Sequence, residues 1–176
     1  MTITAIKNAV TEVLPPVTPE AYREGMSSLA AAVNVVTTTG PEGRAGFTAT
    51  AVCSVSDSPA TLLVCLNRGA SVHKVFKNST HLVINTLTSQ HQLISNTFGG
   101  KAPMSERFEI GEWVESTTGC PRLADAAVSF DCIITEVKSV ATHDVIFCQV
   151  VDIKQDPEAD ALLYYQRGYH SACKDA

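Results

Sequence analysis

The chain has 176 residues and a net charge of −5, with 45% hydrophobic and 18% charged residues, which is the size and composition of one globular domain. Its 13 lysine and arginine residues form no cluster of the kind that follows a phosphate backbone, so nucleic acid is not expected as a partner. No apolar run approaches the roughly 20 residues of a transmembrane helix, and the amino terminus lacks the layout of a signal peptide, so we expect a cytoplasmic protein without a membrane span.

The amino-terminal part is predicted to be an arm followed by a helix. Residues 1–17 carry no sustained pattern and are expected to lie over the surface or over a partner subunit, whereas residues 18–176 form a single domain. Thr18 is a typical N-cap and Pro19 suits the first helical position. The apolar spacing extends this helix to Ala30.

A strand over 32–38 and a turn at 40–43 lead into the most informative stretch, Gly46–Asn67. The first half, 48–54, has small and hydroxyl-bearing residues, so a flat ligand could lie against its backbone. The second half, 61–66, is a continuous apolar run that is typical of a buried strand. An ordinary hairpin remains an alternative interpretation, because small residues in strands often serve close packing.

The next segment contains a short helix, predicted over 72–77 with Ser71 as its N-cap. Unpaired N–H groups at a helix start can bind an anion, and Asn67 and Arg68 lie close by in the sequence. Simple capping by Ser71 is the alternative. A strand is predicted over 81–87.

A second helix is predicted from Gln90 to Thr97, with Ser89 as its cap. Its end, Phe98-Gly99-Gly100-Lys101, is either a glycine C-cap or a loop that contacts an anion. Residues 102–118 are expected to be irregular.

The rest of the chain is predicted to be β structure, with strands over 127–137, 145–153 and 161–165 and loops over 141–144 and 155–160. So many strands with only two or three helices indicate a barrel or a sandwich. Neither GxGxxG nor GxxxxGK[ST] occurs, so the sequence signals no Rossmann or P-loop nucleotide site.

The cysteines occur singly, without a CxxC pair, and are expected to be free thiols. A catalytic role for Cys53 stays open, although no histidine is close in sequence. No histidine pair has metal-ligand spacing with a cysteine or carboxylate, so no metal is expected.

A series of short blocks carries a family resemblance. The blocks are Gly46–Val55, Ser58-Pro59, Leu62–Asn67, Ser71, Asn85, Phe98–Gly100, Glu106–Phe108, Ser129–Cys132, Thr142-His143 and Tyr169-His170. In this order they resemble the short-chain NAD(P)H:flavin reductases, the reductase components of two-component flavin monooxygenases. The chain looks closest to the FMN reductases of pyrimidine catabolism and is similar to the reductases that serve 4-hydroxyphenylacetate and chlorophenol hydroxylases.

The resemblance implies a mainly β fold with a few helices, a split β-barrel of the FMN-binding flavin reductase type that forms a homodimer. It implies an FMN reductase that prefers NADH, with FAD and NADPH as the alternative flavin and donor, and with hydride transfer and release of reduced flavin to a separate monooxygenase. Two alternatives stay open: an FMN-binding split-barrel module without turnover, and a corrinoid reductase of a sister group.

The resemblance also implies a set of site residues. The flavin ring would lie on Thr48, Ala49, Thr50, Ala51, Cys53 and Ser54, and its ribityl phosphate near Asn67, Arg68 and Ser71. Phe98, Gly99 and Lys101 would close over it, with His143 as the catalytic residue on the nicotinamide side and Arg167, Tyr169 and His170 beside the pyridine nucleotide. Gly168 stands where relatives often have a larger residue, which leaves NADH against NADPH open.

Overall fold

The computed structural model describes residues 14–172. Most of the arm predicted for residues 1–17 lies outside them, as does Cys173. The helical elements are α2 (Pro19–Ser27), α3 (His73–Lys77), the 3-10 turn η1 (Ser89–His91), α4 (Gln92–Gly99) and α5 (Met104–Arg107). The strands are β1 (Ala31–Ala32), β2 (Asn34–Gly40), β3 (Gly43–Ala49), β4 (Val52–Asp57), β5 (Ala60–Asn67), β6 (His81–Thr86), β7 (Trp113–Glu115), β8 (Pro121–Leu123), β9 (Val128–Val140), β10 (His143–Gln155), β11 (Ala161–Tyr165) and β12 (Gly168–Ala172).

The expectation of a mainly β fold with a few helices is confirmed. Seven antiparallel strands form one sheet in the order β3-β2-β6-β9-β10-β5-β4, and smaller sheets are built from β1-β11-β12 and β7-β8. The two edge strands of the large sheet, β3 and β4, follow one another in the chain. The corner between them is tied back by a hydrogen bond from the Cys65 amide to the Ala51 carbonyl, 3.1 Å long.

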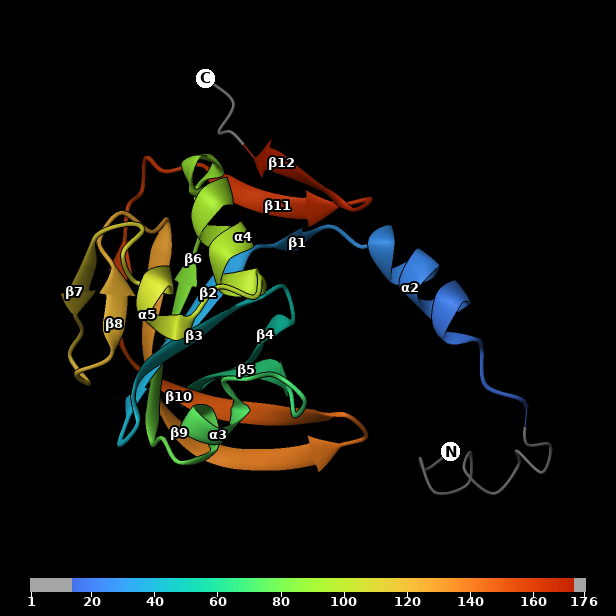
Figure 1. Cartoon of the computed structure of the whole chain (residues 1–176), viewed down its shortest axis with the longest axis horizontal. Coiled ribbons are helices and arrows are strands. Elements are labelled where there is room, and N and C mark those ends of the chain that lie inside the picture. Colours follow the sequence, from blue (N-terminus) through green and yellow to red (C-terminus); the bar gives the residue numbers. More distant parts are fainter. Residues whose placement is uncertain (1–13, 173–176) are drawn as a thin grey trace.

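The core has two parts that meet at β2. Val36 packs with Phe76 and Leu82 inside the large sheet, whereas Val35 packs with Phe98 and other residues beneath α4. Successive residues of a strand face opposite sides, and β2 is buried on both of them. Figure 1 shows α4 and α5 on the same side of the molecule and α2 standing off from it.

The predicted start of the first helix is confirmed, and its predicted end is wrong. The Thr18 hydroxyl accepts a hydrogen bond from the Ala21 amide at 3.2 Å. The helix stops at Ser27 rather than at Ala30, because Ala31 already pairs with β11 in an extended conformation. Among the residues that the structure describes, no helix is long and apolar enough to cross a membrane.

Two predicted caps are also wrong. Helix α3 begins at His73 after Val72, and Ser71 makes no capping bond to it. Thr88, not Ser89, caps η1, since its side chain and that of His91 form a reciprocal capping box. With only five residues, α3 also gives weak support for an anion site at its start.

Three further predictions are corrected. The stretch 48–54 is not one strand, because it bends between Ala49 and Val52. The loop predicted over 141–144 is only a two-residue turn, and His143 is the first residue of β10. The segment predicted to be irregular over 102–118 contains α5 and β7.

Candidate functional site

The bend after β3 forms one wall of a cavity of about 430 Å³, called the main cavity below. The cavity gathers nine of the predicted site residues, from four elements (β3, β5, α4 and β10) and the segments beside them. They are Thr48, Ala49, Thr50, Ala51, Asn67, Ser71, Phe98, Gly99 and His143. Residues up to 95 positions apart in the sequence therefore face one space (143 − 48).

The β3 wall has little bulk and is fixed to its neighbours. The Thr48 hydroxyl donates to the Ser95 carbonyl of α4 at 2.7 Å, which ties the end of β3 to this helix. Earlier in β3, a Cβ on Gly46 would lie only 2.7 Å from the Phe98 ring. Glycine at position 46 therefore allows Phe98 to pack directly on the strand beneath the cavity.

Asn67 and His143 lie opposite each other at the other side of the main cavity. They are paired in register where β5 and β10 meet. The Asn67 carboxamide oxygen accepts from the Gly69 amide at 2.8 Å, which shapes the turn toward Ser71. His143 is half-buried, and its Nδ1 lies 2.9 Å from the Thr142 hydroxyl.

Asp144, the residue after His143, does not line the cavity but connects two of the elements around it. The Asp144 carboxylate accepts from the Ser139 hydroxyl at 2.7 Å and lies 2.7 Å from His73 Nε2. The hydrogen bond from Ser139, followed by that with His73, lowers the pKa of Asp144 below its ordinary value. This pair joins the start of α3 to the start of β10, so it fixes two sides of the main cavity relative to each other.

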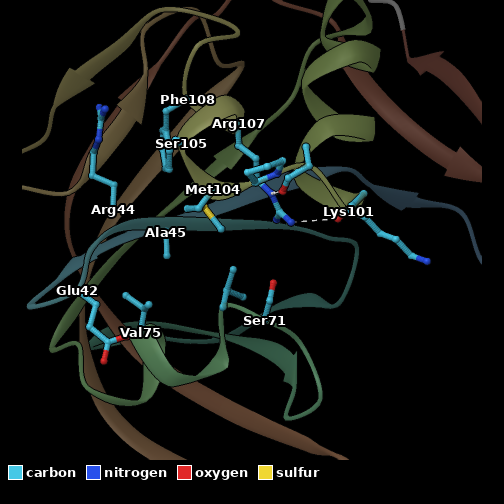
Figure 2. A pocket seen from close by; sticks show the side chains of 14 residues that line it. Glu42, Arg44, Ala45, Ser71, Val75, Lys101, Met104, Ser105, Arg107 and Phe108 are labelled. Atoms are coloured by element: carbon cyan, nitrogen blue, oxygen red, sulfur yellow. Dashed lines mark hydrogen bonds between the residues drawn. The ribbon is translucent and has the colours of Figure 1, made fainter.

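A second space, the cationic cavity, has a volume of about 710 Å³ (Figure 2). It shares Ser71, Val72, Gly100 and Arg107 with the main cavity, so the two are adjacent. Its other basic residues are Arg44 and Lys101. The one carboxylate in its lining, Glu42, is already paired with Lys74 at 2.5 Å.

Arg107 is a candidate site residue that the sequence interpretation missed. It was part of the block Glu106–Phe108 but received no role. A basic residue in a polar stretch is usually exposed, whereas Arg107 is 5% exposed and lines both cavities. Its hydrogen-bond acceptors are main-chain carbonyls, which leave no side-chain pattern in the sequence.

Tyr169 lies on the other side of the β3 wall. It lines a cavity of about 340 Å³ together with Thr48, Ala49, Thr50 and Gly99. Its hydroxyl lies 2.8 Å from the Ser95 hydroxyl and donates to the Asn96 carboxamide oxygen at 2.9 Å. The last strand is thereby attached to α4 beside the main cavity.

The remaining predicted site residues do not line the main cavity. Arg68 donates to the Ala141 carbonyl, and Arg167 forms an ion pair of 2.6 Å with Glu24. His170 Nε2 lies 3.2 Å from the Tyr165 carbonyl. Cys53 lines another adjacent space, the apolar cavity of about 860 Å³, which shares Thr50, Ala51 and Cys65 with the main cavity. Ser54 is exposed in β4, and Lys101 lines the cationic cavity.

The part of the chain that the structure describes contains five of the six cysteines. Cys53, Cys65, Cys120, Cys132 and Cys148 are free there, as expected. Burial raises the pKa of the Cys148 thiol to about 12 and that of Cys132 above its ordinary value. Over residues 14–172 no group of three or more His, Cys, Asp or Glu side chains could hold a metal ion.

The chain is similar to known proteins over most of its length. Residues 26–172 match the model of the flavin reductase like domain. The FMN reductase (NADH) RutF of Enterobacter cloacae is 52% identical over 157 residues, 89% of this chain and 96% of that protein. RutF of Stutzerimonas stutzeri is 54% identical over 155 residues, 88% of this chain and 89% of its own. The crystal structure of a putative flavin reductase from Haemophilus somnus is 47% identical, with a TM-score of 0.87 over 89% of this chain and 100% of that one.

Proposed function

Because the chain belongs to the family of flavin reductase-like domains, we propose that it is an FMN reductase that uses NADH. The observation that carries the proposal is the main cavity, which gathers nine predicted site residues around a wall of small side chains. Its volume of about 430 Å³ lies within the roughly 300–1,000 Å³ of small-molecule sites. The reduced flavin is a product that leaves for a separate monooxygenase.

The residues fit FMN. A flat ring can lie against the low-bulk segment Thr48–Ala51, where no long side chain intervenes. A phosphate is served by the adjacent cationic cavity, whose lining includes Arg44, Lys101 and Arg107 and only one carboxylate, which is already paired. An uncompensated group of cations attracts an anionic ligand.

In the proposed mechanism the side chains position the reactants. Bound FMN supplies the redox chemistry, since it accepts a hydride from NADH. The β3 wall and Asn67 orient the ring, and the Phe98–Gly100 segment excludes water from one side. His143 borders the opening where the nicotinamide approaches. Such catalysis depends on proximity and orientation, so no acid–base pair of side chains is required.

We also infer that two copies of the chain form a split-barrel homodimer in the cytoplasm. Helix α2 buries no residue in the single chain. Its Tyr22, Met26 and nearby Leu29 are 60%, 45% and 62% exposed, and all three line the apolar cavity. An apolar face of this kind is typical of a subunit interface. The free thiols suit a reducing compartment.

Oxidation of NADH by the purified protein tests the function. With FMN present, the NADH absorbance should fall far faster than in the mixture without protein; no acceleration with either FMN or FAD would refute the proposal. Parallel assays with NADPH identify the preferred donor. A protein that binds FMN but whose flavin NADH cannot bleach anaerobically would be a binding module, and reduction of a corrinoid instead of flavin would indicate the sister activity.

A further inference from the structure

Arg107 spans the gap between α5 and the segment that closes the main cavity. Its guanidinium donates four hydrogen bonds, all to main-chain carbonyls. The acceptors are Gly46 at 3.1 Å, Phe98 at 2.9 Å, Gly100 at 3.0 Å and Ala102 at 3.0 Å. Figure 2 shows Arg107 at the edge of the cationic cavity, with the Lys101 side chain extending away from its guanidinium.

Three of these four acceptors belong to one segment, Phe98–Ala102, which comprises the last two residues of α4 and the three residues after it and is called the closing loop below. The fourth acceptor, Gly46, belongs to β3. Arg107 therefore ties the closing loop to the strand that leads into the small-residue wall of the main cavity. Gly99 and Gly100 are adjacent in this loop, and paired glycines would otherwise leave its backbone free to adopt many conformations.

The charge of Arg107 is not matched by a carboxylate. Burial lowers the pKa of its guanidinium, but arginine stays protonated in proteins. It has no ion-pair partner among residues 14–172. Only a planar group with several fixed donors can satisfy four carbonyls that converge in this way, so a lysine at this position could not replace the full set.

We propose that Arg107 is the positioning residue that holds the closing loop in place over the main cavity and thereby sets the affinity for the flavin. This inference rests on the proposed function. A loop already fixed in its binding conformation loses little conformational entropy when a ligand binds. Without Arg107 that cost would fall on the flavin, and the carbonyls of Gly46 and Phe98 would lose their buried donor.

The test compares Arg107→Met, Arg107→Lys and a control with the wild type. Thr37→Val is the control, because Thr37 is fully buried and its hydroxyl bonds the Val83 and Pro121 carbonyls, outside both cavities. FMN binding is measured by flavin fluorescence. Loop closure is measured without flavin, as the rate of trypsin cleavage after Lys101.

Arg107→Met should weaken FMN binding about tenfold or more, the loss expected for hydrogen bonds to a charged group. The KM for NADH and the kcat at saturating FMN should change much less, and cleavage after Lys101 should accelerate. Arg107→Lys should fall between the wild type and Arg107→Met in both measurements. Thr37→Val should lower the thermal stability yet leave FMN affinity and cleavage near the wild-type values.

The inference is overturned if both Arg107 variants keep wild-type FMN affinity and wild-type cleavage. Equal effects of Thr37→Val and the Arg107 variants at matched stability would also overturn it, because the role would then be general stabilisation. Should Arg107→Met not fold, Arg107→Lys decides by the same measurements. Failure of the wild type to bind FMN would instead refute the proposed function, and the cleavage assay would still test loop closure.

Discussion

Alanine in place of Gly46 should destabilise the protein by about 1–3 kcal/mol, the usual cost of overpacking a core. The new Cβ would lie 2.7 and 2.9 Å from two Phe98 ring carbons and 3.1 Å from the Val36 carbonyl oxygen. Carbon atoms prefer about 3.5–4.0 Å, so the shortest contact is too close by about 0.8 Å. The ring cannot swing aside, because Phe98 is 1% exposed and packs on Phe108 and Trp113 at centroid distances of 5.2 Å each.

The assay is urea unfolding at a fixed protein concentration, since association would add a concentration dependence. Gly25→Ala is the matched control: no atom lies within 4 Å of its Cβ in the exposed helix α2, so it should stabilise by about 0.5–1 kcal/mol. Phe98→Leu removes the obstructing ring, and the Gly46→Ala cost should shrink by about 1 kcal/mol in that background. A Gly46→Ala protein within about 0.5 kcal/mol of wild type, or no coupling to position 98, would refute the reasoning.

The other predictions concern His143, Asp144 and Cys148. His143→Ala should slow hydride transfer or raise the KM for NADH while flavin binding persists; unchanged steady-state kinetics would remove it from the site. The lowered pKa of Asp144 means that its ionised form stabilises the fold above the unfolded-state value of about 3.9, and that this stability is lost as pH falls through the lower folded pKa. The stability difference between wild type and Asp144→Asn should therefore shrink in that acid range, and a pH-independent difference in urea unfolding would contradict this. The Cys148 thiol, with its pKa raised to about 12, should react with an alkylating reagent only in denaturant, as mass spectrometry can show; labelling of the native protein at the denatured rate would contradict the structure.

The sequence predicted those elements that neighbouring residues specify by themselves. Thr18 and Pro19 specify a helix start through their own side chains, and the structure confirms this cap. The continuous apolar run within β5 predicted a buried strand, and in the sheet its residues alternate between buried and half-buried positions. The order of strands in the large sheet could not be predicted from such signals, because it depends on pairings between distant segments.

The errors have equally specific causes. Ser71 and Ser89 are good cap residues, but Val72 and Thr88 occupy the cap positions, and a hydroxyl pattern alone cannot locate a cap to one residue. The turn before His143 was predicted too long because Ala141, with a φ of 50°, occupies a conformation that usually signals glycine or asparagine.

Candidate site residues could be predicted only where their own side chains carry the signal. The pairing of Asn67 with His143 follows from the β5–β10 register, which no local pattern specifies. Arg107 was missed for a related reason. Its partners are carbonyls as far away as Gly46, and every residue type has a carbonyl.

The low bulk of residues 48–54 admitted two interpretations, a ligand bed and ordinary close packing, and the bend in this stretch explains why neither covered all of it. Up to Ala51 the chain runs along the main cavity, and its small side chains leave that wall open. From Val52 onward the chain belongs to β4, where Cys53 and Ser54 pair with Leu63 and Leu62 of β5. The same composition thus serves the cavity in its first half and strand pairing in its second, and the boundary between the two is where the chain passes from one edge of the large sheet to the other.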